Sequence, residues 1–179
     1  MLRKLLRAMG ARDEPPRGET PPGSSPRPLP GEWLEQQLDK LERGMVDEVE
    51  LVARNACARD PGDAQARYLV GKTLLARGAF SAGASELRRA IDLDPGTADF
   101  HHELGLACRE LGQRREALAA FERALAIRHD HVSAAYYAGL THAELGEHED
   151  AKDCYSLALE FDPLSSAART RALSRVARR

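Results

Sequence analysis

The sequence predicts an all-α protein built from stacked antiparallel helix pairs. Alanine and leucine, both strong helix formers, number 29 and 24 among the 179 residues, whereas valine and isoleucine number only 6 and 2. Glycines recur with a period of 34 residues in two independent series: Gly44, Gly78, Gly112 and Gly146, then Gly71, Gly105 and Gly139. Pro61, Pro95 and Pro163 are separated by one and two of the same periods. A period of this length indicates stacked helical repeats.

Residues 1–29 are expected to be a disordered, basic, proline-rich tail and linker. Seven of the ten prolines fall in the first 30 residues, mixed with glycine, serine, arginine and glutamate. Within this tail, residues 1–10 place leucines and a methionine on one helical face and three basic residues on the other. Two alternatives stay open for this segment, namely peripheral contact with an anionic membrane or a partner, and a solvated tail.

The repeat domain is predicted over 30–165, in the frames 30–63, 64–97, 98–131 and 132–165. Each frame should form two helices; in the third, Thr97 is the expected N-cap and Gly112 the expected end of the first helix. Gly105 lies in the middle of that helix, where glycine is unfavourable. We therefore expect the backbone of the neighbouring helix to pass close to it.

The two ends of the predicted stack differ from its middle. The first frame is degenerate, because Gln37 and Val49 occupy positions where the other frames have small residues, so we expect an N-terminal cap with wider helix spacing. Residues 166–179 should form a C-terminal solvating helix, with an apolar side on the last repeat and five arginines facing water.

The spacing of small and bulky residues resembles the tetratricopeptide repeat family. The third frame carries LeuGly at 104–105, Ala117, Phe121 and Ala124. The second carries ValGly at 70–71, Leu74, Leu87, Ala90 and Pro95, and the fourth AlaGly at 138–139, Ala151, Tyr155, Ala158 and Pro163. The resemblance covers residues 30–165. It implies a right-handed solenoid whose first helices line a concave groove that binds extended or helical peptides.

Candidate groove residues lie on the first helices, opposite the glycine positions. From the second frame these are Gln65, Tyr68, Leu69, Lys72 and Leu75; from the third, Asp99, His102, Glu103, Leu106 and Arg109; from the fourth, Ser133, Tyr136, Tyr137, Leu140 and Glu144. Three of the four tyrosines fall in this set, and tyrosine offers a large contact area with a polar end. The alternative is that these tyrosines fill gaps between neighbouring first helices.

Charge and composition argue against several other classes of protein. Residues 30–165 carry 15 basic and 25 acidic side chains, and this net charge of −10 would repel nucleic acid. No run of 18 apolar residues exists, and no histidine and carboxylate set has a catalytic or metal-binding spacing. Three cysteines without a CxxC pair fit a reducing compartment. We therefore expect a cytoplasmic, non-enzymatic protein with no cofactor and no metal.

Two classes of function remain from the sequence. The leading one is an adaptor or scaffold that holds a peptide or protein segment in the groove. The alternative is an accessory subunit of an enzyme system, such as glycan or methyl transfer machinery. The sequence leaves the partner and the oligomeric state open, because a repeat fold alone names no ligand.

Overall fold

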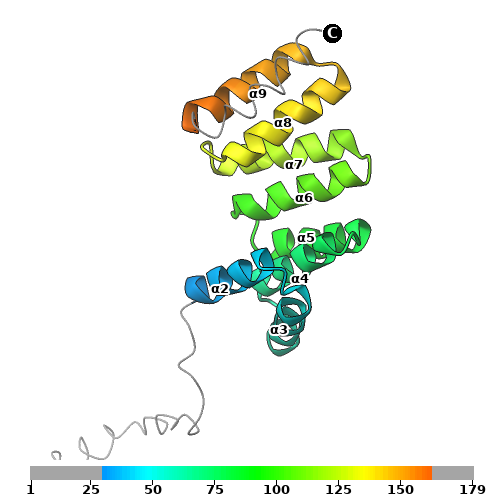
Figure 1. Cartoon of the computed structure of the whole chain (residues 1–179), viewed down its shortest axis with the longest axis vertical. Coiled ribbons are helices and arrows are strands. Elements are labelled where there is room, and N and C mark those ends of the chain that lie inside the picture. The colour runs from blue at the N-terminus through cyan, green and yellow to red at the C-terminus, as the bar shows by residue number, and fades with distance from the viewer. Residues whose placement is uncertain (1–29, 163–179) are drawn as a thin grey trace, which may run out of the picture. The chain divides into compact units, whose positions relative to one another are not determined.

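The fold was analysed in a computed structural model that describes residues 30–162. The chain divides into two units, Met1–Trp33 and Leu34–Arg179, and the contacts below all lie within the second. The described residues form eight helices and no strand (Figure 1): α2 (Pro30–Glu42), α3 (Val46–Arg59), α4 (Ala64–Ala76), α5 (Phe80–Leu93), α6 (Ala98–Glu110), α7 (Arg114–Ile127), α8 (Val132–Leu145) and α9 (His148–Phe161). The expected N-terminal tail and C-terminal helix lie outside the described residues.

The turn inside each helix pair repeats one backbone arrangement. Gly44, Gly78, Gly112 and Gly146 have φ angles of 80°, 74°, 74° and 81°, in the left-handed region that favours glycine. In every case the residue after the glycine donates its amide hydrogen to the carbonyl five residues earlier, at 2.9 to 3.0 Å. This pattern is a Schellman C-cap, and it explains why glycine recurs at these positions.

Successive helices pack in chain order, so the expected stack of helix pairs is confirmed. The second helix of each pair packs on the first helix of the next, α3 on α4, α5 on α6 and α7 on α8. Among the first helices, α4 also contacts α6, and α6 contacts α8. Fully buried side chains such as Leu69, Leu87, Phe100 and Phe121 fill the interior. We call the surface formed by α4, α6 and α8 the first-helix face (Figure 1).

Glycines in the middle of the first helices make room for bulky side chains of the paired helix. A Cβ atom on Gly105 would lie 2.5 to 2.8 Å from three atoms of the Phe121 ring. The Phe121 ring therefore supplies the three atoms nearest to this position, and the expected passing backbone at Gly105 stays a prediction. At Gly139 a ring and a backbone atom are both close, since a Cβ would meet the Tyr155 ring at 2.8 Å and the Ala151 carbonyl oxygen at 3.1 Å.

The first helix pair departs from this arrangement. α2 does not approach α3 as closely as the helices of the other pairs approach each other. Gln37 occupies the position where later first helices carry glycine, and its buried Oε1 has no hydrogen-bond partner within residues 30–162. A longer side chain at this position keeps two helix backbones apart. The first repeat is thus degenerate in structure as well as in sequence.

The caps of the first helices differ in a way that the sequence did not indicate. The carboxylate of Asp63 accepts a hydrogen bond from the Ala66 amide at 2.9 Å and caps α4. Thr97 precedes α6 as expected, but its hydroxyl donates to the Asp94 carboxylate at 2.6 Å and does not bond the helix. Among residues 30–162, no helix is long and apolar enough to cross a membrane.

Candidate functional site

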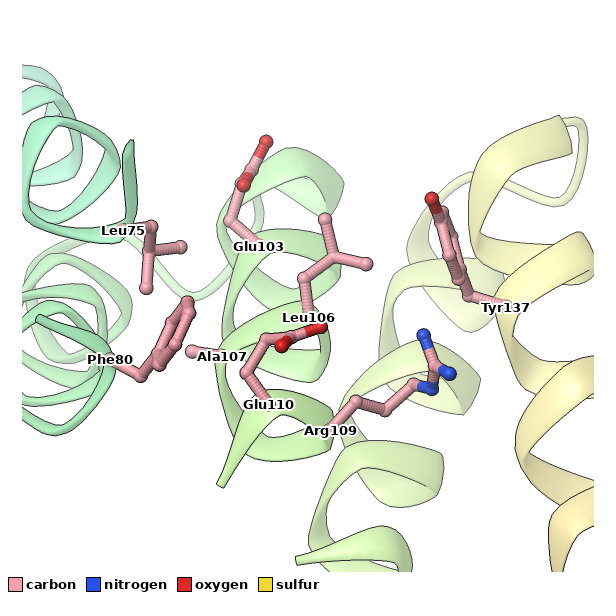
Figure 2. A pocket seen from close by; sticks show the side chains of 8 residues that line it. All are labelled: Leu75, Phe80, Glu103, Leu106, Ala107, Arg109, Glu110 and Tyr137. Carbon is pink, nitrogen blue, oxygen red and sulfur yellow. The ribbon is translucent and has the colours of Figure 1, made fainter. Parts of the chain in front are cut away.

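A cavity of about 290 Å³ opens on the first-helix face (Figure 2). Its lining comes from four helices: Leu75 of α4, Phe80 of α5, Glu103, Leu106, Ala107, Arg109 and Glu110 of α6, and Tyr137 of α8. The volume is close to the lower end, about 300 Å³, of the range typical of ligand pockets. It therefore suits one or two side chains of a partner rather than a large cofactor.

The walls of the cavity are mainly apolar and only partly covered. In Figure 2, Leu75 and Phe80 form one side, Leu106 stands in the middle and Tyr137 lies opposite. All four side chains keep part of their surface exposed. An incoming apolar side chain would remove this surface from water, which is favourable by about 25 cal/mol per Å².

The structure brings together five of the candidate groove residues and three residues outside that set, Phe80, Ala107 and Glu110. The candidate groove residues that line the cavity are Leu75, Glu103, Leu106, Arg109 and Tyr137. Phe80 was missed because only first helices were considered, whereas Phe80 begins the second helix α5. The sequence did offer one signal, because Phe80 is a large apolar residue whereas the equivalent positions in the next two frames hold the polar residues Arg114 and His148.

Ion pairs join the first helices of neighbouring repeats beside the cavity. Lys72 Nζ lies 2.6 Å from Glu103 Oε1, between α4 and α6. Arg109 Nη2 lies 2.8 Å from Glu144 Oε1, between α6 and α8, and Arg114 Nε reaches the other oxygen of Glu144 at 3.1 Å. The Arg109 guanidinium also lies over the Tyr137 ring, 5.5 Å from its centroid. Each of the three cations therefore has a carboxylate partner, and Arg109 and Arg114 share that of Glu144.

Asp99 and His131 form a hydrogen-bonded group at the start of α8. His131 Nδ1 accepts from the Ala134 amide at 3.2 Å, so its Nε2 carries the hydrogen and donates to Asp99 at 3.1 Å. Arg128 adds an ion pair with Asp99 at 2.7 Å. The hydrogen bond from His131, followed by the charge of Arg128, lowers the pKa of Asp99 to about 2, although burial opposes the shift. This carboxylate is ionised at neutral pH.

His102 lies among aromatic rings between this group and the cavity. Its ring centroid is 4.8 Å from that of His131 and about 6 Å from those of Phe121 and Tyr137. Burial, which is the largest cause, lowers the pKa of His102 to about 4, and the nearby charge of Lys72 acts in the same direction. Its buried Nε2 has no hydrogen-bond partner in the described residues. His102 is therefore a neutral packing residue at pH 7 and not a general acid.

Two of the candidate groove residues are buried in the described structure. Leu69 is 0% exposed and Tyr68 is 4% exposed. The Tyr68 ring stacks on Phe100 with centroids 4.8 Å apart, and burial followed by the charge of Glu103 raises its pKa. Tyr68 fills a gap between first helices, as the alternative interpretation of the tyrosines holds. Neither residue offers surface to a ligand in this conformation.

The remaining candidates surround the cavity without lining it. Tyr136 packs against Tyr137 and Tyr155, with ring centroids 5.3 and 5.9 Å away. Gln65, Ser133 and Leu140 are half-buried on α4 and α8. A binding role for these four residues stays a prediction.

The cysteines and one polar cluster give no sign of catalytic or metal chemistry. Cys57, Cys108 and Cys154 are free, and burial raises the pKa of each thiol, which disfavours the nucleophilic thiolate. His142, Glu147 and Asp150 have potential ligand atoms within 4.8 Å of one another. However, His142 Nδ1 hydrogen-bonds Glu147 at 2.8 Å, and Arg115 pairs with the same carboxylate at 2.6 Å. These contacts account for the cluster as part of the turn before α9.

Comparison with known proteins identifies the same repeats. The family model of the tetratricopeptide repeat matches residues 47–98 and 102–166. No curated protein sequence matches the chain.

Solved structures match at low sequence identity. A protein from Thermus thermophilus, described as a thermophilic tetratricopeptide repeat protein, is 23% identical and has a TM-score of 0.66, over 77% of this chain and 76% of its own. A MamA protein is 25% identical with a TM-score of 0.63, over 74% and 75%. MamA from Desulfovibrio magneticus RS-1 is 17% identical with a TM-score of 0.64, over 75% and 76%.

These structural matches agree with the stacked helix pairs described above. The tetratricopeptide repeat fold supports a role in protein–protein interaction, and its members are generally non-catalytic adaptors. Because the family model covers well over half of the sequence, the chain belongs to the tetratricopeptide repeat family.

Proposed function

We propose that this protein is a non-enzymatic adaptor or scaffold that binds a segment of a partner protein at the cavity on the first-helix face. The observation that carries the proposal is the convergence of Leu75, Phe80, Leu106 and Tyr137 on one open cavity. Partly exposed apolar side chains gathered in this way are typical of a surface that another molecule covers. The family's general role in binding protein partners supports the same function.

The cavity is prepared for binding by contacts that already exist within the protein. Arg109 is held by Glu144 and lies on the face of the Tyr137 ring, so the wall formed by Arg109 and Tyr137 is ordered before a partner arrives. Side chains that are already ordered lose less conformational entropy on binding. We expect the partner to supply a large apolar side chain as an anchor, because the walls offer mostly apolar surface.

Other parts of the proposal rest on the sequence. The free cysteines suit a reducing compartment, and we place the protein in the cytoplasm. The domain bounds at 30–165 and 166–179, and contact of residues 1–10 with an anionic membrane or a partner, are proposals of the same kind. No observation among the described residues favours the alternative of an accessory enzyme subunit.

A phage-displayed library of random dodecapeptides, panned on the purified full chain, tests the proposed function. We expect enrichment of peptides that contain a large apolar residue. The Leu106→Asp variant should bind the enriched peptides at least tenfold more weakly, because a carboxylate would stand in the middle of the cavity. Leu93→Asp is the matched control, since Leu93 is exposed on α5 and outside the cavity.

Circular dichroism should show that both variants are folded at the assay temperature. If the Leu106→Asp and Leu93→Asp proteins retain the enriched peptides equally well, the cavity is not the binding site.

A further inference from the structure

The charged side chains around the cavity do not all have ion-pair partners. Lys72, Arg109 and Arg114 each have a carboxylate within 3.1 Å. Glu110 also lines the cavity and is exposed, but it has no ion-pair or hydrogen-bond partner among residues 30–162. Within the part of the chain that the structure describes, the rim of the cavity therefore has one carboxylate without an ion-pair partner, that of Glu110, and no cation without one, although Arg109 and Arg114 share Glu144.

The position of Glu110 in its helix strengthens this negative site. Glu110 is the last residue of α6, one turn after Leu106, so its carboxylate lies beside the apolar wall of the cavity (Figure 2). The carbonyl groups at a helix C-terminus carry a partial negative charge that adds to that of the carboxylate. The net charge of −10 over residues 30–165 acts in the same direction at longer range.

We infer that the partner segment carries a lysine or arginine next to its apolar anchor, with the basic side chain facing Glu110. This inference rests on the proposed function and adds to it the chemistry of the partner. The anchor enters between Leu106 and Tyr137, and the adjacent cation remains at the rim, where it stays partly hydrated. Arg109 also lines the cavity, but its guanidinium is paired with Glu144 and lies over the Tyr137 ring, so the Glu110 carboxylate is open to a basic residue of the partner. An acidic residue at this point would instead face Glu110 without a partner.

The dodecapeptide library tests this inference when it is panned on the parent chain and on Glu110→Lys. Peptides enriched on the parent should carry Lys or Arg within two residues of the apolar anchor. Peptides enriched on Glu110→Lys should carry Asp or Glu there instead. For a synthetic, fluorescein-labelled peptide from the parent pool, anisotropy should show affinity falling about five- to tenfold in Glu110→Lys at low salt. The difference should shrink as sodium chloride is added.

Two further variants provide controls for this measurement. Glu110→Gln removes the charge without reversing it, and should weaken binding only about two- to threefold. Glu122→Lys makes the same change of net charge on an exposed part of α7, away from the cavity lining, and should change affinity less than twofold.

The outcomes separate this inference from the proposed function. The inference alone is overturned if the enriched peptides depend on Leu106 but show no preference for a charge beside the anchor. It is also overturned if Glu110→Lys leaves that charge preference unchanged. Equal losses in Glu110→Lys and Glu122→Lys would show only a general effect of net charge and would also overturn it. If no peptide is enriched in a Leu106-dependent way, the proposed function fails and the inference fails with it.

Discussion

Replacing Gly105 with leucine should lower the free energy of unfolding by more than about 2 kcal/mol, although leucine is the better helix former. A Cβ at this position would lie 2.5 Å from the nearest atom of the Phe121 ring. Phe121 is itself 0% exposed in the core, so the ring cannot move aside without disturbing its neighbours. Urea titration of the full chain, followed by circular dichroism, measures the effect.

Gly31→Leu is the matched control for this experiment. Gly31 lies in α2, and no atom outside its helix neighbours comes within 4 Å of a Cβ built there. Its substitution should leave stability within about 0.5 kcal/mol of the parent, as is usual for an exposed site. A Gly105→Leu protein as stable as the parent would refute the account of helix packing.

The protein should lose about 2 kcal/mol of stability between pH 7 and pH 5 through His102 alone. The pKa of His102 is about 4 in the folded protein, against about 6.5 for histidine in an unfolded chain. Between these values the unfolded chain binds the proton and the folded chain does not. The free energy of unfolding therefore keeps its full value with respect to His102 above pH 6.5 and decreases as the pH falls towards 4.

His102→Phe isolates the contribution of His102 from those of the other titrating groups. Phenylalanine keeps an aromatic ring beside Phe121 and Tyr137 and removes a buried nitrogen that has no hydrogen-bond partner in the described part of the chain. The difference in unfolding free energy between pH 7 and pH 5 should be smaller by about 2 kcal/mol in this variant. His148→Gln, at an exposed position, should keep the parent's pH dependence. If the His102→Phe protein shows the parent's pH dependence, the neutral buried histidine is not the cause.

The fold could be predicted from the sequence because the repeat places the same physical requirement at the same position four times. Gly44, Gly78, Gly112 and Gly146 each have a positive φ, and a single glycine of this kind would have been only a weak signal. The need for a small residue at Gly105 was foreseen in outline. Its cause was not, because the spacing of residues does not say whether a backbone or a ring fills the space.

The cavity of the proposed binding surface was predictable in position but not in detail. The helix period places Glu103, Leu106 and Arg109 on one side of α6, and these residues do line the cavity. It does not tell whether a residue there is covered by the next repeat, as the Phe100 ring covers Tyr68. Nor does it pair Lys72 with Glu103, 31 residues away, since such contacts depend on the stacking of helices and on side-chain rotamers.

Methyl NMR of the leucine-labelled full chain, titrated with a synthetic peptide from the library, tests the central claim most directly. The claim is that a partner segment binds at the cavity on the first-helix face. We predict that the methyl signals of Leu75 and Leu106 shift in proportion to binding, because both side chains line the cavity. The signals of Leu51 and Leu93, exposed on the second helices α3 and α5, should stay in place. Shifts at Leu51 or Leu93 with Leu75 and Leu106 unchanged would contradict the account.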